Sequence, residues 1–522
     1  MRRIDQVLLS GRRAAYGILL ASLGLVLLGL AAAQAASARE PFHFVVTLDE
    51  PTALRSLPDG AAATPSVTGR LYVFLSQRHT GEPRFGPNWF NPEPFFGVDV
   101  RNVRPGGACR VDQQADGFPA TLAKLPAGKY RVQAILDHDF YCQNHARGVG
   151  NFFSEVAELD FDPSTTPPLD LRLTKVVSEE PFPQTNRVRE VAVRSELLSR
   201  FHGREVIDRA GVALPASYDQ QPERRYPVVY EIPGFGGTHR MALRYASASA
   251  DDEVEFIRVM LSGNCKWGHH VYADSATNGP RGEALVREMI PHIDATFRTV
   301  ADPAARFVTG HSSGGWSSLW LQVTYPDTFG GVWSTSPDPV DFSDFQQVDL
   351  YADPPLSLYV DPQGNERPIA RSGAQPVLWF ASFGRMDDVL SRGGQLRSFE
   401  AAFSPLGTDG LPKRLWDRTT GRIDPAVAKA WQEYDIRLKL ERNWKVLEPK
   451  LRGKLHITTG GLDTFYLNGA VEKLAQSLKD LGSDAQIVIV PGKGHGDLLT
   501  SDLRRQMRRE MSAAFKGREA AK

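Results

Sequence analysis

The chain has few cysteines and no excess of either charge, and both absences exclude classes of function. Lys and Arg together number 61, as do Asp and Glu, so the formal net charge is zero. A chain without a basic excess has no electrostatic preference for nucleic acid or another polyanion, and neither is expected as a partner. The three cysteines, at positions 109, 142 and 265, are too scattered for a zinc site, and no metal is expected.

The sequence also lacks an internal repeat and a long low-complexity run. At 522 residues the chain exceeds one ordinary domain. We therefore expect two domains, or one domain that carries a large insertion. Apolar residues make up 42% of the chain, which is ordinary for a globular protein and allows a large core.

The first forty residues contain the three parts of a secretory signal peptide. A basic start, MRRIDQVLLSGRR, precedes the apolar run AAYGILLASLGLVLLGLAAA, and A-x-A cleavage patterns end at Ala35 and Ala38. This order predicts a signal peptide over residues 1–38 and a mature protein that is periplasmic or secreted. The apolar run approaches the length of a membrane span, so an uncleaved N-terminal anchor is the alternative. Only in that case is a membrane expected as a partner.

Export bears on the state of the cysteines. In an oxidising compartment Cys109 and Cys142 can form a disulfide bond, because both lie in the same early region of the chain. That pairing would leave Cys265 as a free thiol. Their spacing alone does not establish the bond.

Residues 40–176 have the pattern of an all-β domain. Short runs of apolar or alternating residues recur between clusters of Pro and Gly, and they read FHFVVTL, GRLYVFLS, FFGVDVRNV, KYRVQAILD and LDLRLTKV. Several short strands at such spacing predict a β-sandwich. We expect this sandwich to be independent and to take no part in the functional site of the remaining chain.

Residues 187–522 instead alternate strands with helices. The predicted strands read YPVVYEI, RFVTG, GGVWSTS, LHITTG and AQIVIVPG. The predicted helices read GEALVREMIPHIDATFR, with a kink expected at Pro291, then GGWSSLWLQVTYP and AVEKLAQSLKDLG. This alternation predicts an α/β fold with a mostly parallel, doubly wound sheet. Residues 338–450 are too long for a plain loop and are expected to form a lid-like insertion over the edge of the sheet.

The stretch FVTGHSSGGW contains the pattern G-x-S-x-G around Ser312, between a predicted strand and a predicted helix. In that setting the serine lies on a sharp, strained turn with its hydroxyl exposed above the sheet, and Gly310 and Gly314 leave room for neighbouring backbone. The alternative is a chance Gly/Ser turn, because the pattern alone is common. The strand and the helix on either side favour Ser312 as a nucleophile.

A serine nucleophile needs a base, and His495 in IVIVPGKGHGDLL is the best candidate. It follows the last predicted strand, which is where the chain order Ser…Asp…His places the base. The rival histidines, His269 and His270, precede the serine and are more simply explained by packing or by contact with substrate.

An oxyanion hole needs two backbone N–H donors. The N–H of Ser313 is expected to supply one, because it directly follows the nucleophile. The other is expected from Phe235 or Gly236 in the loop IPGFGGTH, although a Gly-rich turn that merely ends a strand is the alternative.

These residues carry a resemblance to a known family. From about residue 187 onward the chain resembles the putative esterases among the α/β-hydrolases, which include enterochelin-esterase-like and esterase D-like proteins. The matching stretches are VALPASYD, RRYPVVYEIPGFGG, NGPRGEALVREMIPHID, RFVTGHSSGGWSSLWLQVTYPDTFGGVWS, GGLDTFYLNGAVEKL and PGKGHGD. The resemblance implies an α/β-hydrolase fold, ester hydrolysis without a cofactor, and the triad Ser312, Asp463 and His495. One departure is IPGFGG, where many relatives have a histidine before the glycine.

Two aspartates compete for the role of the acid that orients His495. Asp463 in TTGGLDTFYLN follows the strand LHITT, in the ordinary chain order and with the family match. Asp338 in WSTSPDPVDF follows the preceding strand, a position to which the acid migrates in some α/β-hydrolases. Asp463 is favoured, and Asp338 is the alternative acid.

The substrate is not readable from the sequence. Siderophore, sugar and peptide-linked esters are all compatible with it, so a small-molecule or glycan-linked ester is the expected partner. Six tryptophans supply either an aromatic pocket or core and lid packing, and packing is the simpler interpretation: Trp267, Trp316, Trp320, Trp379, Trp416 and Trp431. Two other functions stay open, namely an acyltransferase that passes the acyl group to a sugar and a catalytically silent envelope-binding protein.

Overall fold

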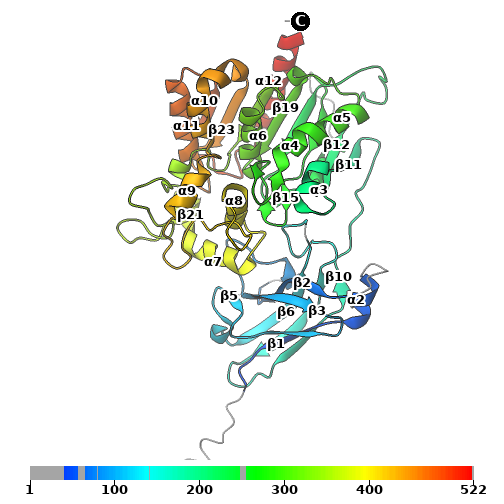
Figure 1. Ribbon diagram of the computed structural model, residues 1–522, viewed down its shortest axis with the longest axis vertical. Helices are drawn as coiled ribbons and strands as arrows, with labels where there is room; N and C mark the ends of the chain where they lie inside the picture. Colours follow the sequence, from blue (N-terminus) through cyan, green and yellow to red (C-terminus); the bar gives the residue numbers. More distant parts are fainter. Residues whose placement is uncertain (1–39, 57–64, 79, 140, 247–253, 520–522) are drawn as a thin grey trace, which may run out of the picture.

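The computed structural model describes residues 40–56, 65–78, 80–139, 141–246 and 254–519, and Figure 1 shows how they are arranged. An all-β portion formed by the N-terminal residues lies at one end of the molecule, below a larger α/β portion. The predicted signal peptide, residues 1–38, lies outside the described residues. Among the described helices, none has both the length and the apolar character needed to cross a membrane.

The N-terminal portion consists of two sheets that share a core. A three-stranded sheet has the order β4-β1-β9, and a seven-stranded sheet has the order β10-β7-β6-β2-β3-β5, with β8 paired to β6. Apolar residues that alternate along β1 and β2, such as Phe44, Val46, Leu71 and Val73, pack together between the sheets. All five predicted strand runs form strands. The bounds are β1 Phe44–Leu48, β2 Val67–Ser76, β3 Phe95–Val103, β4 Ala108–Val111, β5 Asp116–Phe118, β6 Gly128–Asp137, β7 Phe152–Phe153, β8 Ala157–Phe161, β9 Leu169–Leu173 and β10 Lys175–Val176, with α2 Glu50–Ser56, η1 Pro83–Phe85 and η2 Leu122–Lys124.

An eight-stranded sheet with the order β11-β12-β14-β13-β19-β20-β23-β24 forms the centre of the second portion. The six strands from β14 to β24 are parallel, and β11 and β12 extend one edge in antiparallel pairing. The sheet has helices on both faces, so this portion has the α/β-hydrolase fold. The strand bounds are β11 Val188–Arg194, β12 Ile207–Ala213, β13 Val228–Ile232, β14 Ile257–Met260, β19 Arg306–His311, β20 Gly331–Thr335, β23 Leu455–Gly460 and β24 Gln486–Val490.

Side chains on the central strands are apolar on both faces, as buried parallel strands require. On β13, Val228 and Tyr230 pack toward the core that contains α6, whereas Val229 packs with Phe307 and Met511 of α12 on the other face. The helices and short strands around the sheet are α3 Glu196–His202, η3 His239–Tyr245, β15 Asn264–Cys265, β16 Gly268–His269, β17 Asp274–Ser275, β18 Gly279–Pro280, η5 Pro303–Ala305, α6 Ser313–Thr324, α11 Asn468–Asp480 and α12 Ser501–Glu519.

The helix that contains Pro291 changes its winding just before the proline. It runs through α4 (Arg281–Ala284), the π-helical segment η4 (Leu285–Met289) and α5 (Ile290–Thr296). Proline lacks an N–H and its ring clashes with the carbonyl four residues earlier, which a normal α-turn would place too close. A wider π-turn directly before Pro291 removes that conflict.

The chain between β20 and β23 packs around aromatic side chains. It contains η6 Phe342–Asp344, β21 Pro368–Ser372, β22 Gln375–Trp379, α7 Phe380–Leu390, α8 Gln395–Phe403, α9 Pro425–Trp431 and α10 Ile436–Leu451. Phe342, Phe403 and Trp431 are within 5.2–5.6 Å of one another between ring centroids. In Figure 1, α7, α8 and α9 lie between the central sheet and the N-terminal portion, whereas α10 lies beside the sheet with α11.

The two portions share a continuous core. Tyr72, Phe74 and Phe95, on the face of the seven-stranded sheet that points away from its own core, belong to the same buried cluster as Phe380 and Phe383 of α7. The Tyr72 hydroxyl donates to the Leu390 carbonyl over 2.6 Å. The two portions are therefore packed against each other, and independent folding of the N-terminal portion stays a prediction.

Candidate active site

Ser312 lies at the sharp turn between β19 and α6, with φ 61° and ψ −127°. This region is strained for a residue with a side chain, and such strain is typical of functional sites. The glycines on either side make the turn possible. A Cβ on Gly310 would overlap the Gly314 carbonyl, and a Cβ on Gly314 would overlap the Ile232 carbonyl. The backbone N–H of Ser312 donates to Thr335 O over 3.0 Å, which ties the turn to β20.

His495 and Asp463 meet at the same edge of the sheet. His495 Nδ1 lies 2.8 Å from Asp463 Oδ2. The Asp463 side chain is fully buried and also accepts hydrogen bonds from the backbone N–H groups of Phe465, at 2.9 Å, and Leu467, at 3.4 Å. Burial alone would raise the pKa of Asp463. The hydrogen bond and charge of His495, with the two backbone donors, outweigh it and hold the pKa of Asp463 below its ordinary value.

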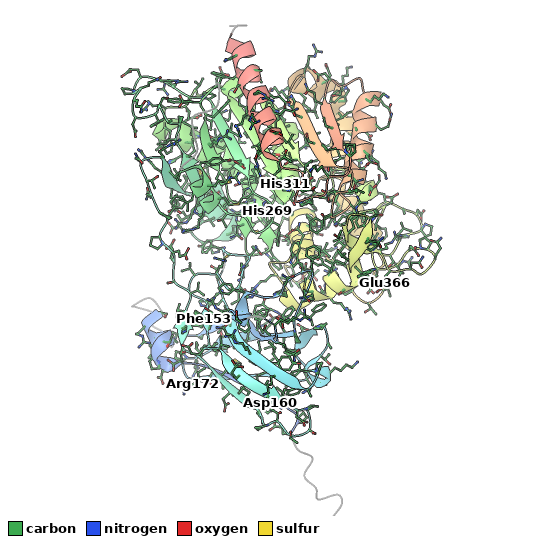
Figure 2. All side chains as sticks on the ribbon, turned by 180° about the vertical axis from the view of Figure 1, so that it is seen from behind. Phe153, Asp160, Arg172, His269, His311 and Glu366 are labelled. Atoms are coloured by element: carbon green, nitrogen blue, oxygen red, sulfur yellow. The ribbon has the colours of Figure 1, made fainter. Side chains whose placement is uncertain are left out.

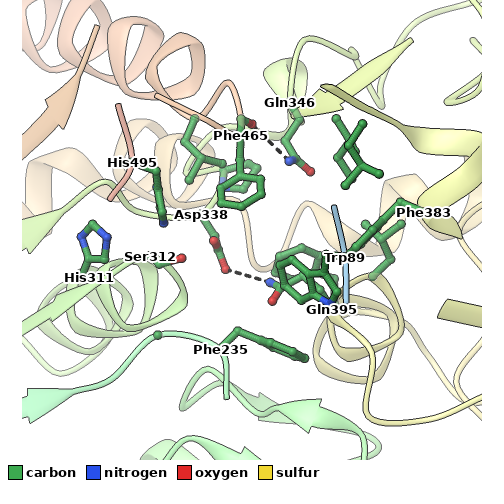
Figure 3. Close-up of a pocket in the computed structure, with 17 residues that line it drawn as sticks. Trp89, Phe235, His311, Ser312, Asp338, Gln346, Phe383, Gln395, Phe465 and His495 are labelled. Atoms are coloured by element: carbon green, nitrogen blue, oxygen red, sulfur yellow. Dashed lines mark hydrogen bonds between the residues drawn. The ribbon is translucent and has the colours of Figure 1, made fainter. Parts of the chain in front are cut away.

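Figure 3 shows the His495 ring above the Ser312 hydroxyl, with a ring nitrogen turned toward that side. Both residues line one pocket. Since Nδ1 is occupied by Asp463, Nε2 is the nitrogen available to the serine. The Phe465 ring packs edge-on against the imidazole with centroids 5.0 Å apart, which restricts its rotation.

Asp338 lies near Ser312 but has different partners from Asp463. Its Oδ2 accepts a hydrogen bond from Ser313 Oγ over 2.6 Å and a longer one from Gln395 Nε2 over 3.5 Å. Burial raises the pKa of Asp338 to about 6. Among the described residues, the carboxylate that hydrogen-bonds to His495 is Asp463 and not Asp338.

The expected oxyanion donors lie beside the serine. Ser313 is the first residue of α6, where a helix leaves its N–H groups without a partner in the helix. Gly234 and Phe235 line the pocket, and the turn is closed by a 3.0 Å hydrogen bond from Gly237 N–H to Gly234 O. Gly236, at φ 79°, does not line this pocket. Of the two expected donors in this loop, Phe235 is therefore the better placed.

The rival histidines are buried supports of the loops around the site. His269 Nε2 lies 3.0 Å from Pro233 O, and His270 Nε2 lies 3.2 Å from Ser262 O. Burial lowers the pKa of His269 to about 4, so its ring is neutral near neutral pH. A third histidine, His311, lies with its ring centroid 4.6 Å from that of His495, and burial lowers its pKa to about 3. None of these three contacts an aspartate as His495 does.

The pocket beside Ser312 has a volume of about 300 Å³ and mostly apolar walls. Phe383, Leu396 and Phe399 come from α7 and α8 of the predicted insertion. Trp89 comes from the N-terminal portion and lies 5.1 Å from Phe383 and 5.7 Å from Phe235 between ring centroids. The expectation that residues 40–176 take no part in this site was therefore wrong, because Trp89 forms part of the pocket wall.

No pattern in the sequence singles out Trp89, which lies in the irregular stretch GPNWFNPEP. None of the six tryptophans considered from the sequence is among the residues that line the pocket. Trp316 and Trp431 are buried, and Trp316 stacks on Trp320 with centroids 5.2 Å apart. Trp316, Trp320, Trp416 and Trp431 therefore pack the core, as the simpler interpretation predicted, whereas Trp379 is 37% exposed. Gln346 and Gln395 were also missed, because glutamines in a long insertion carry no recognisable pattern.

All three cysteines are free thiols in this structure. Cys109 lies on β4, whereas Cys142 lies next to the α/β portion, with Sγ 3.7 Å from Asn264 Nδ2. Cys265 is buried. The described residues contain no group of three or more His, Cys, Asp or Glu side chains arranged to hold a metal ion.

Comparisons with known proteins found similar solved structures and one matching family. Matches among solved structures are distant. A ferulic acid esterase is 15% identical, with 63% of this chain and 98% of that chain covered and a TM-score of 0.41. An S-formylglutathione hydrolase from Agrobacterium tumefaciens is 14% identical, with 63% and 95% covered and a TM-score of 0.39. A fluorophosphonate-binding serine hydrolase of Staphylococcus aureus is 13% identical, with 63% and 98% covered and a TM-score of 0.38.

The sequence profile of the family described as "Putative esterase" matches residues 208–480, more than half of the chain. The matched range contains Ser312 and Asp463 and ends before His495. The chain belongs to the putative esterase family and is a carboxylic ester hydrolase.

Proposed function

We propose that Ser312, His495 and Asp463 form the catalytic triad of this esterase. The observation that carries the proposal is the 2.8 Å contact between His495 Nδ1 and Asp463 Oδ2, next to a serine held on a strained turn. A buried carboxylate at Nδ1 fixes the tautomer in which Nε2 is free to accept a proton. It also stabilises the imidazolium that forms when the proton arrives.

The reaction proceeds in two acyl-transfer steps. His495 Nε2 accepts the Ser312 proton as Oγ attacks the ester carbonyl, and the carbonyl π-electrons move onto oxygen. The tetrahedral intermediate collapses, the alcohol leaves with the proton from His495, and an acyl-serine remains. Water then attacks the acyl-serine with the same base, and the carboxylic acid is released from Ser312.

The developing oxyanion binds to the backbone N–H groups of Ser313 and Phe235. The N-terminus of α6 points its unpaired donors at the site, which favours negative charge there. The loss of one such donor in other serine hydrolases costs roughly 3 kcal/mol of transition-state stabilisation. A loss of this size lowers the rate by roughly a hundredfold, so the Phe235 turn contributes substantially to catalysis.

Labelling with a fluorophosphonate probe tests the nucleophile. We expect Ser312→Ala to remain folded and to lose both probe labelling and ester hydrolysis. The matched control is Ser318→Ala, because Ser318 is buried in the same helix and only hydrogen-bonds within it. Turnover by Ser312→Ala above a few percent of wild type would contradict the assignment.

Two other functions were compatible with the sequence, a catalytically silent envelope-binding protein and an acyltransferase, and they require a separate test. The close contact of His495 with Asp463 argues against a catalytically silent envelope-binding protein. An acyltransferase would form the same acyl-serine and pass the acyl group to a sugar. Product analysis with and without a sugar acceptor separates the two outcomes, because only a transferase yields an acylated sugar.

We also propose that the protein is exported, that residues 40–176 form a β-sandwich, and that part of residues 338–450 acts as a lid. The basic start, apolar run and A-x-A pattern support cleavage of residues 1–38. Two sheets with a shared core support a β-sandwich for residues 40–176. Pocket walls formed by α7 and α8 support a lid role within residues 338–450. Sizing of the mature protein by mass spectrometry tests the cleavage.

A further inference from the structure

Asp338 is a buried acid that has no role in the proposed reaction. Its side chain lines the pocket, and the residue is 5% exposed. Figure 3 shows its carboxyl group between Ser312 and Gln395. Since Asp463 already orients His495, the triad needs no second carboxylate.

Only one oxygen of this carboxyl group is used by the protein. Oδ2 accepts the hydrogen bonds from Ser313 and Gln395, whereas Oδ1 accepts none from any described residue. Protein atoms do not fully enclose Oδ1, so this oxygen is open to the cavity. The carboxyl group therefore presents a vacant acceptor to whatever fills the pocket.

An acceptor of this kind is costly in apolar surroundings unless a donor reaches it. Leu396, Phe399 and Ile369 line the same pocket, and the chain places neither Lys nor Arg among its lining residues. A buried polar group without a partner costs free energy, and the cost is larger for a charged one. The cost arises when a bound acyl group covers Oδ1, and a hydrogen-bond donor on that group removes it. Asp338 therefore favours substrates that carry such a donor.

The position of Asp338 indicates which half of the ester it contacts. The leaving alcohol must face His495, because that residue protonates it. The Asp338 carboxyl group instead accepts from the Ser313 side chain, and Figure 3 shows it on the side of Ser312 that faces Gln395 and the apolar pocket, which is where an acyl chain fits. A group next to Asp338 therefore belongs to the acyl half of the ester.

We propose that Asp338 Oδ1 binds a hydrogen-bond donor, a hydroxyl or protonated amine, on the acyl group of the substrate, close to the scissile carbonyl. This inference rests on the proposed esterase function and narrows its substrate class. The preferred substrate is then an ester of an acid with an apolar body and one such donor. Gln395 holds Asp338 from the side and is a positioning residue.

The test uses p-nitrophenyl esters with one leaving group and matched acyl groups. The acyl groups are butanoyl, 2- and 3-hydroxybutanoyl, their methoxy counterparts and 2-aminobutanoyl. The methoxy esters keep the electronic effect of the oxygen but lack the donor and add a methyl group, whereas the butanoyl ester lacks the donor without added bulk. We expect the wild-type protein to show kcat/KM roughly tenfold to a hundredfold higher for a hydroxy or amino ester than for its donor-free counterpart. The hydroxy and amino series show which donor is preferred.

Asp338→Ala should reduce this ratio to near one. The matched control is Asp387→Asn, because Asp387 is also a buried acid on the insertion but does not line the pocket, and its variant should keep the wild-type ratio. Equal kcat/KM for hydroxy and methoxy esters in the wild type would overturn the proposal, even if the variant failed to fold. An equal loss on all esters in Asp338→Ala would also overturn it, as the mark of a structural or triad role.

Failure of the esterase function gives a different result. In that case fluorophosphonate would not label Ser312 in the wild-type protein, and none of the esters would be hydrolysed. Labelling and turnover without donor preference would leave the esterase function in place and reject the role of Asp338 alone.

Discussion

Two aspartates lie close to Ser312, and their surroundings shift their pKa values in opposite directions. Asp463 accepts from His495 and from two backbone N–H groups, which lowers its pKa against the effect of burial. Asp338 has two neutral donors, and burial raises its pKa to about 6. Chain order and the family resemblance favoured Asp463 over Asp338, but the residue types could not show which carboxylate meets the imidazole.

Replacement of each aspartate by asparagine separates their roles. We expect Asp463→Asn to lower kcat by about 10⁴-fold with little change in KM, because the amide holds the wrong tautomer of His495. Steady-state kinetics on a donor-free ester measures this. Asp338→Asn should have a much smaller effect on the same substrate. If kcat falls by orders of magnitude in Asp338→Asn but stays near the wild-type value in Asp463→Asn, Asp338 is the acid of the triad.

The raised pKa of Asp338 predicts a contribution to stability that depends on pH. The ordinary value is 3.8 and the folded value is about 6, so the folded protein holds this proton more tightly than the unfolded chain. The contribution is complete below about pH 4 and is lost as pH rises through about 6. Two pKa units correspond to about 3 kcal/mol.

Urea unfolding at pH 4 and pH 7 provides the measurement. The difference in unfolding free energy between wild type and Asp338→Asn should fall by up to that amount from the lower to the higher pH, because other titrating groups cancel in the difference. A difference that stays constant with pH would show that the pKa of Asp338 is the same in the folded and unfolded states.

At the scale of elements, the Asp435 side chain both caps a helix and links it to a distant part of the insertion, which the periodicity of apolar residues does not show. Asp435 precedes α10 and accepts from Leu438 N–H over 2.9 Å, which caps the helix. The same side chain accepts from Phe342 N–H over 2.8 Å and from the Tyr351 hydroxyl over 2.9 Å. One buried carboxylate therefore joins α10 to the start of the insertion, a link between residues nearly a hundred positions apart.

Asp435→Ala should lower the free energy of unfolding by about 2–4 kcal/mol, since it removes a cap and leaves two further donors without their partner. The matched control is Asp424→Ala at the start of α9. Asp424 also caps its helix, through Ala426 and Val427 N–H, so its loss should cost only about 1 kcal/mol. Chemical denaturation measures both values. Equal effects of the two substitutions would contradict the linking role of Asp435.

At the scale of the whole molecule, the N-terminal portion completes the pocket. Arg70 donates to the Val389 carbonyl at the end of α7 over 2.8 Å and 3.0 Å, next to the hydrogen bond from Tyr72 to Leu390. These contacts hold the N-terminal portion against the insertion that carries Phe383. Trp89 then packs on Phe383 and Phe235, so a residue of one portion shapes the site of the other.

Trp89→Ala should lower kcat/KM by roughly tenfold to a hundredfold, because it removes an apolar wall worth about 1–3 kcal/mol to a bound acyl group. The melting temperature should change little, since Trp89 is only partly buried. Phe85→Ala, in the same stretch but exposed and away from the pocket, is the control. Unchanged kcat/KM on every ester tested would show that Trp89 does not contact substrate.

The sequence by itself determined the sharp turn at Ser312, the proposed nucleophile, and the order of the elements. The glycines around Ser312, the strand before it and the helix after it are local features, and local sterics allow few other conformations there. His495 and Asp463 could be predicted as partners of Ser312 because the loops after successive parallel strands collect at one edge of a sheet. The five N-terminal strands were found because alternation along a strand is also a local signal.

Only the tertiary structure decided what surrounds that chemistry. The partners of Asp338, the placement of Trp89 in the pocket and the core shared by the two portions depend on contacts between residues far apart in the chain. Trp89 and Phe383 are separated by almost three hundred residues, and no spacing in the sequence records that they touch. Such contacts form because apolar faces left open by one portion are buried by the other, and this pairing is set by the whole fold.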